Sequence, residues 1–165
     1  MDLARLARHL VVLPGAVKRA FPPSAMSAIE QAIAESERQH GGEVRFAAEP
    51  ALDTSALLAG QTARERAIEV FSLLRLWDTS ERNGVLIYLL LADRDIEIVA
   101  DRGVNAKVAS AEWEGVCRTM EQGLKAGRNG EAVVAGIQRV SALLAHHFPR
   151  RADDRNELPD RPVRL

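Results

Sequence analysis

The chain has 165 residues, and its 22 basic and 23 acidic side chains give a net charge of −1. An apolar content of 47% and a charged content of 27% are ordinary for a globular protein, and the length fits one domain with tails. The balanced charge and an aromatic content of only 4% argue against a nucleic-acid partner.

The first predicted element is a basic amphipathic helix within residues 1–20. Arg5 and Arg8 interrupt the apolar run that a secretory signal would need, and no run in the chain reaches the roughly 18 apolar residues of a transmembrane segment. We expect this helix to dock on the domain, with a weak contact to a membrane surface or a partner as the alternative. We expect a cytoplasmic location. The apolar stripe of the helix consists of Leu3, Leu6, Leu10 and Leu13.

Residues 21–149 are expected to form one domain of alternating helices and strands. A pair of prolines starts the first helix and Gly41-Gly42 ends it. Strands are predicted at residues 43–49, 85–91 and 96–100, with a hairpin turn between the last two. Helices are predicted at residues 62–77, 110–127 and 131–146. The tail, residues 150–165, loses periodicity and mixes both charge signs, so we expect it to be mobile.

The order of these elements predicts the fold class. A strand, a crossover helix and a second strand favour parallel pairing, and the hairpin adds an antiparallel third strand. Helices should cover both faces, which gives an α/β fold, a three-layer α/β/α sandwich around a small mixed β-sheet. The helix over residues 62–77 should turn one apolar face to this sheet, formed by Ala67, Val70, Phe71, Leu74 and Trp77.

The hairpin turn offers a motif that we set aside. Asp93 and Asp95 have the spacing of the nucleophile motif in haloacid-dehalogenase-type phosphatases, but Glu97 stands where Thr or Val is wanted. The chain also turns straight back into a strand, so no loop leads to a phosphate-binding helix. A charged hairpin turn is the better interpretation. Cys117 lies on an apolar helical stripe, which favours packing over catalysis.

Polar residues gather at one edge of the expected sheet. The starts of the first two strands and the end of the third should meet there, which brings Glu43, Asn83 and Asp101 together. The two preceding helices end at the same edge and add Glu37 and Asp78. Crowded carboxylates repel one another unless a cation or a proton relieves them, and oxygen ligands favour Ca²⁺ or Mg²⁺. The alternative is a set of solvated cap and turn acids without a ligand.

These segments resemble the TPM domain family in its short soluble bacterial form. The matching pieces lie in order between Phe21 and Pro149, and the part from Thr79 to Gly103 is the most specific. They are "ESERQHGGEVRF", "RERAIEVFSLLRLWDTSERNGVLIYLLL", "IEIVADRGV", "EWEGVCRTM" and "HFP". Many members carry a signal peptide and a membrane helix, which we do not find in this chain.

The resemblance implies a three-layer fold and a divalent cation, more often Ca²⁺ than Mg²⁺, in an acid-lined cleft. The acidic family positions fall on Glu37, Glu43 and Asp101, with Asn83 beside them, and Asp78 is added by the sheet geometry. His40 departs from the small hydroxyl residue usual in related short proteins.

Two functions follow as expectations. The first is a non-catalytic, cation-binding accessory or interaction domain with a protein partner of unknown identity, because no nucleophile–base pair can be assembled from the sequence. The second is a weak metal-assisted acid phosphatase, in which Asp101 or Glu43 would be ligand or base and Arg82 or Arg102 would hold the phosphate.

Overall fold

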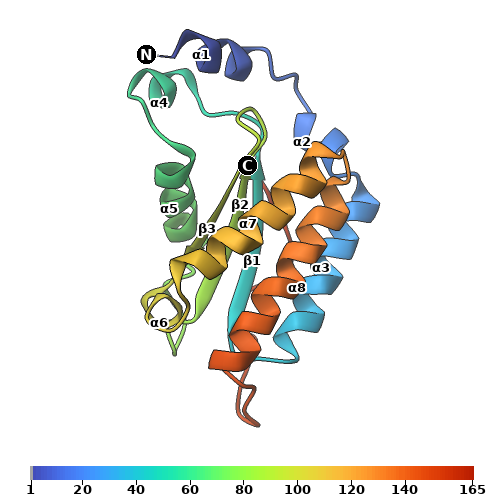
Figure 1. Cartoon of the computed structure of the whole chain (residues 1–165), viewed down its shortest axis with the longest axis vertical. Helices are drawn as coiled ribbons and strands as arrows, with labels where there is room; N and C mark the ends of the chain where they lie inside the picture. The colour runs from blue at the N-terminus through green and yellow to red at the C-terminus, as the bar shows by residue number, and fades with distance from the viewer. Residues whose placement is uncertain (1) are drawn as a thin grey trace.

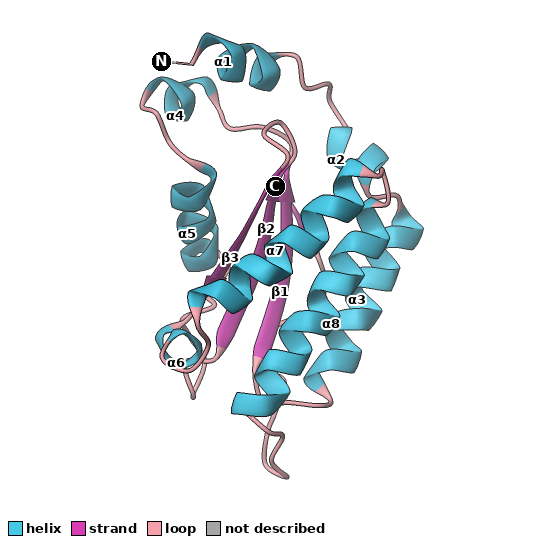
Figure 2. Cartoon of the chain, viewed as in Figure 1, coloured by secondary structure: helices cyan, strands magenta, loops and turns pink. Residues whose placement is uncertain are grey.

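A mixed four-stranded sheet forms the centre of the computed structural model, which describes residues 2–165 (Figure 2). The strand order is β3-β2-β1-β4, with β1 parallel to β2 and β2 antiparallel to β3. The predicted α/β class and the first three strands are confirmed. The strands are β1 (Glu43–Glu49), β2 (Gly84–Leu90), β3 (Asp95–Ala100) and β4 (Val163–Arg164).

Helices cover both faces of this sheet (Figure 1). On one face α3, α7 and α8 pack together, and on the other face α5 packs against β2 and β3. The long helices are α3 (Pro23–Glu37), α5 (Ala63–Leu73), α7 (Ser110–Lys125) and α8 (Asn129–His147). The shorter ones are α1 (Leu3–Leu10), α2 (Ala16–Ala20), α4 (Thr54–Leu58) and α6 (Arg102–Asn105).

Two apolar cores lie between the layers, one on each face of the sheet, so β1 and β2 are buried on both faces. Side chains alternate along a strand, so Val44 and Phe46 enter the core under α3 and α8, while Ala47 enters the core under α5. This double coverage explains why residues 85–91 are apolar without alternation.

The end of α5 differs from the prediction. Trp77 was expected to face the core, but 54% of its surface is exposed, and Leu76 is buried instead. The helix ends at Leu73, and Arg75 adopts a left-handed backbone conformation with a φ of 58°. The chain therefore leaves the helical period before it reaches Trp77, and the sequence spacing no longer decides which residue points inward.

The N-terminal segment forms two short helices, α1 and α2, where one was expected, and Gly15 with a φ of 77° lies between them. Asp93 of the hairpin turn fixes α1: it accepts from Arg5 Nε at 2.8 Å and lies 3.1 Å from His9 Nε2. The buried His9 also accepts the Leu52 backbone N–H through Nδ1 at 3.0 Å. Asp93 thus does more than close a turn. Within residues 2–165 no helix has the length and apolar character needed to cross a membrane.

The C-terminal segment, expected to be mobile, lies against the sheet. Residues of β4 pair in parallel with Ala47 and Ala48 of β1, and the Leu165 N–H donates to the Ala48 carbonyl at 3.0 Å. The sequence of this segment shows no apolar periodicity because backbone groups make these hydrogen bonds, and such groups do not depend on the side chain.

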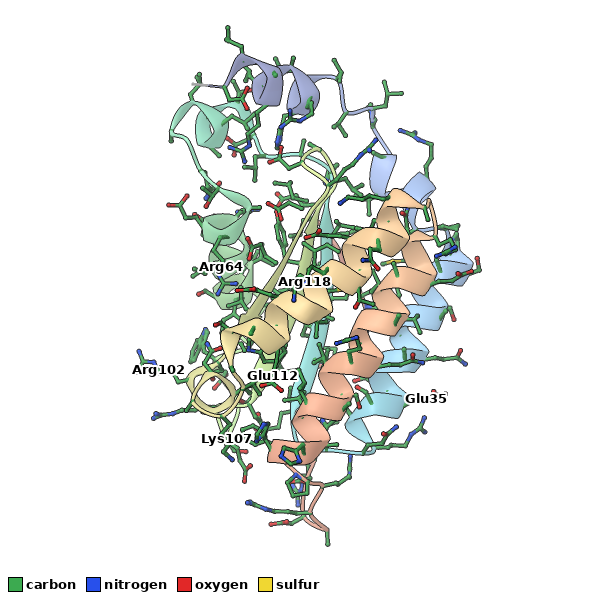
Figure 3. All side chains as sticks on the ribbon, in the orientation of Figure 1. Glu35, Arg64, Arg102, Lys107, Glu112 and Arg118 are labelled. Atoms are coloured by element: carbon green, nitrogen blue, oxygen red, sulfur yellow. The ribbon has the colours of Figure 1, made fainter. Side chains whose placement is uncertain are left out.

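The outer edge of β3 is covered by side chains. Arg64 of α5, labelled in Figure 3, donates to the Ile98 carbonyl at 2.5 Å. Asn105 Nδ2 donates to the Ala100 carbonyl at 2.7 Å. Such coverage occupies acceptors that an edge strand otherwise offers to another chain.

Candidate metal site at the amino end of the sheet

The starts of β1 and β2 and the end of β3 meet at one edge, here called the amino end of the sheet. The Asp101 N–H donates to the Gly84 carbonyl at 2.9 Å, and the Gly103 N–H donates to the Arg82 carbonyl at 3.1 Å. A Cβ on Gly103 would lie 2.5 Å from the Arg82 carbonyl oxygen, so only glycine allows this approach. The close packing brings Asn83 and Asp101 to neighbouring strand ends.

Asn83 and Asp101 each present a buried oxygen that has no hydrogen-bond partner among residues 2–165, Asn83 Oδ1 and Asp101 Oδ2. The other side-chain groups are engaged. Asn83 Nδ2 donates to the Gly41 carbonyl at 2.5 Å, and Asp101 Oδ1 accepts the Arg102 N–H at 2.6 Å. Because buried polar atoms are normally paired, these two oxygens are candidate ligand atoms.

Glu37, the last residue of α3, is buried and protonated at neutral pH. Burial raises its pKa to about 9, and the Val44 N–H that donates to Oε1 at 2.9 Å only partly opposes this shift. The neighbouring carboxylates of Glu43 and Asp160 add to the rise. Oε2 has no hydrogen-bond partner among residues 2–165. The crowding of carboxylates expected from the sequence is thus relieved, at Glu37, by a proton.

Glu43 is held by the C-terminal segment. Its two carboxylate oxygens accept the backbone N–H groups of Glu157 and Leu158 at 2.9 and 3.0 Å. Burial raises the pKa of Glu43, while these two hydrogen bonds lower it. The carboxylate of Glu157 in turn accepts from Ser80 Oγ at 2.9 Å. A segment remote in sequence therefore occupies one of the expected ligands.

Two buried basic side chains lie at the same end. Burial lowers the pKa of Arg45, whose Nε has no hydrogen-bond partner, although Glu37, Asp160 and Glu43 favour its charged form. His40 accepts the Gly42 N–H at 3.1 Å, and burial lowers its pKa to about 4, so its ring is neutral at physiological pH. Arg45 gives the acids a positively charged neighbour that sequence reasoning missed.

Asp78 lies apart from this arrangement. It forms an ion pair of 2.6 Å with Arg75, and 49% of its side chain is exposed. Among residues 2–165, no three His, Cys, Asp or Glu side chains are grouped in a way that could hold a metal ion. A complete carboxylate site is therefore absent from the described part of the chain, and the fit to a cation rests on the free oxygens of Asn83 and Asp101.

A pocket of about 220 Å³ opens beside Asn83. The loop before β2 contributes Ser80 and Glu81, and Arg151 of the C-terminal segment forms an ion pair with Glu81. The acidic residues of the C-terminal segment were the only feature of the sequence that could have predicted this part of the pocket wall. The further tail residues in the wall are Asp153, Asp154, Arg155 and Glu157.

The opposite end of β1 carries a closed polar cluster. Glu49 accepts from Arg66 Nε and Nη2 at 2.9 and 3.0 Å and from the Tyr88 hydroxyl at 2.6 Å. Burial raises the pKa of Tyr88, and the hydrogen bond to Glu49 adds to this effect. Every carboxylate oxygen of Glu49 has a partner, so this cluster offers no free ligand atom.

The family model of the TPM domain matches residues 18–143. This chain belongs to the TPM domain family. The match leaves out α1 and the C-terminal segment that holds Glu43. Comparison with curated proteins gives no match.

Two solved structures are similar to this TPM domain. The BA42 protein of the psychrophilic bacterium Bizionia argentinensis, determined by NMR, has a TM-score of 0.75 and 30% identity, and the match covers 86% of this chain and 93% of that one. The N-terminal domain of a P. gingivalis protein has a TM-score of 0.61 at 12% identity, covering 90% and 93% of the two chains. At that identity the second likeness is one of fold alone.

Proposed function

We propose that this TPM domain is a non-catalytic accessory domain that binds a divalent cation, with Ca²⁺ preferred over Mg²⁺, at the amino end of its sheet. The observation that carries the proposal is the pair of unpartnered buried oxygens, Asn83 Oδ1 and Asp101 Oδ2. Carboxylate and amide oxygens are the ligands that Ca²⁺ takes in proteins, and its flexible coordination tolerates an irregular set.

The other expected ligands differ in how readily they could join. Glu43 would have to release the N–H groups of Glu157 and Leu158, and Glu37 would have to lose its proton. A bound cation would favour both changes, because it stabilises the ionised carboxylates. Asp78 is left out of the proposed ligand set because it pairs with Arg75.

The absence of a catalytic role is supported by the state of the candidate nucleophiles. Burial raises the pKa of Cys117 to about 11, so the reactive thiolate is scarce at neutral pH. Asp93 is engaged by Arg5 and His9. Domains without chemistry act through a partner, and we propose a cytoplasmic protein in that role.

Metal-assisted phosphatase activity is the second candidate. One observation favours it: Arg151 and Arg155 line the pocket beside Asn83 together with several acids. A guanidinium can hold a phosphate while a nearby cation polarises the phosphoryl oxygen. The phosphatase named in the family model agrees with this alternative.

Calorimetric titration of Ca²⁺ and Mg²⁺ into the metal-stripped protein tests the proposal. We expect saturable one-to-one binding that is tighter for Ca²⁺ and weakened at least about tenfold in Asp101→Asn and in Glu43→Gln. Asp101→Asn keeps an oxygen to accept the Arg102 N–H, so the helix cap is retained. Asp78→Asn is the matched control and should bind normally.

Absence of binding at millimolar cation would refute the proposal. Binding that survives both substitutions would place the cation elsewhere. Hydrolysis of p-nitrophenyl phosphate by the cation-loaded protein, lost in Arg151→Met but with cation binding intact, would favour the phosphatase.

A further inference from the structure

Helices α1 and α4 lie at the end of the molecule opposite to the candidate metal site (Figure 1). Exposed apolar side chains gather on these helices and on the turn after α1. Five of the eight large apolar side chains that are exposed among the described residues lie there, each more than 60% exposed. We call these residues the α1 patch. They are Leu3, Leu10, Val11, Leu13 and Leu58.

The inner face of α1 explains why this patch points outward. Arg5 and His9 bind Asp93, and Leu6 packs against the core under α5. Leu3 and Leu10 are seven residues apart, so they lie on one side of the helix, next to Leu6 and away from Arg5 and His9. Both remain more than 60% exposed. Leu58 lines a pocket with Leu6 between α1 and α4, which places α4 at the edge of the same surface.

The charge beside the turn between α1 and α2 is positive. Residues 1–21 contain four basic side chains and one acid, although the whole chain has a net charge of −1. Asp93 forms ion pairs with Arg5 and Arg8. Lys18 and Arg19 are exposed on α2. Arg19 donates to the Leu13 and Pro14 carbonyls, which holds its charge beside the exposed turn. A cationic rim next to exposed leucines complements a surface that is negatively charged outside and apolar beneath.

We propose that the α1 patch docks this protein reversibly on an anionic lipid surface. A short amphipathic helix with basic neighbours lies in the plane of the interface and buries its apolar face at the boundary of head groups and acyl chains. Lys18 and Arg19 would add electrostatic attraction to anionic head groups. The amino end of the sheet lies at the opposite end of the molecule (Figure 1), so docking through the α1 patch would leave it away from the membrane. The proposal is independent of cation binding.

Co-sedimentation with vesicles tests the proposal on the full chain. The probes are vesicles of phosphatidylcholine alone and of phosphatidylcholine mixed with phosphatidylserine. We expect binding only to the mixed vesicles, weakened when salt is raised from about 0.1 M to about 0.5 M because exposed charges are screened. Leu13→Asp should reduce binding at least about tenfold. Leu73→Asp on α5 is the matched control, because Leu13 and Leu73 are both 66% exposed.

Each other outcome would overturn the proposal. Failure of the unmodified protein to bind the mixed vesicles would exclude lipid docking. An equal loss of vesicle binding in Leu13→Asp and Leu73→Asp would mean that non-specific hydrophobic adsorption, and not the α1 patch, causes the binding. If sedimentation equilibrium instead finds a dimer that Leu13→Asp dissociates, without vesicle binding, the patch is a contact between two copies of the chain.

Discussion

Glu43 and Glu49 stand at the two ends of the same strand, and their surroundings differ. Glu49 is matched by side chains: Arg66 binds both of its oxygens, and Tyr88 donates a further hydrogen bond. Within the described residues, Glu43 accepts hydrogen bonds only from backbone N–H groups of the C-terminal segment. The first arrangement pairs the carboxylate with a guanidinium, whereas the second satisfies its hydrogen bonds and leaves it without a salt bridge within the described residues.

The same contrast extends to the residues around each glutamate. Among residues 2–165, no buried side-chain oxygen near Glu49 lacks a hydrogen-bond partner, while the amino end of the sheet holds several unpartnered polar atoms, on Asn83, Asp101 and Glu37. Stability alone favours the closed arrangement, because unpaired buried groups are costly. An end of a fold that keeps such groups is therefore a better candidate for a binding site than one that closes them.

Removal of Glu49 should give the largest loss of stability. In Glu49→Ala, the Arg66 guanidinium and the Tyr88 hydroxyl lose their shared partner, and we expect the free energy of unfolding to fall by about 3 kcal/mol. Urea unfolding measures it. The control is Glu69→Ala, since Glu69 binds the same arginine at 3.0 Å but is exposed, and such pairs contribute about 0.5 kcal/mol. Equal costs in both variants would show that the cluster at Glu49 is not a buried structural pair.

Glu37 should give an effect that depends on pH and that is smaller than the effect of Glu49→Ala over any single pH unit. Its folded pKa of about 9 lies above the ordinary value of 4.5, so the folded state holds a proton that the unfolded state has lost. This contribution to stability is fully present below pH 4.5 and is lost as the pH rises through about 9, with a slope of up to about 1.4 kcal/mol per pH unit.

Substitution of Glu37 isolates this contribution. Glu37→Gln imitates the protonated acid and cannot lose a proton. Between pH 5 and pH 9 the free energy of unfolding of this variant should therefore fall by about 1 kcal/mol less per pH unit than that of the unmodified protein. Urea unfolding in chelator-containing buffer across that range measures the difference. Glu35→Gln, an exposed position on the same helix (Figure 3), should leave the slope unchanged. Parallel pH profiles for the unmodified protein and Glu37→Gln would mean that Glu37 is ionised in the folded state.

The sequence predicted those parts of the fold that depend on side-chain periodicity. The three long strands and the four long helices follow apolar spacing, and the edge that collects Glu37, Glu43, Asn83 and Asp101 follows from strand direction. The prediction for Trp77 was wrong because the left-handed backbone conformation of Arg75 interrupts the helical periodicity. No residue type in that stretch indicates such a conformation.

The site itself was predictable only in part, because its remaining contacts are long-range or made by the backbone. The N–H groups of Glu157 and Leu158 reach Glu43 across more than 110 positions of sequence, and every residue other than proline carries such a group. Arg45 appeared as one polar position of a strand, and nothing in its neighbours indicated burial among acids. Asp78 had an arginine three residues before it, and that spacing was the available signal for a surface ion pair.

Asp78→Asn should therefore have the smallest effect, although Asp78 and Asp101 both flank the amino end of the sheet in sequence. Its ion pair with Arg75 is half exposed, so we expect a change in unfolding free energy within about 0.5 kcal/mol. Cation affinity should also be unchanged, whereas Asp101→Asn should weaken it. If Asp78→Asn weakens cation binding as much as Asp101→Asn does, the ion pair with Arg75 must open when the cation binds. The unpartnered oxygens would then be a poor guide to the ligands, and exposed acids at this end would have to be tested one by one.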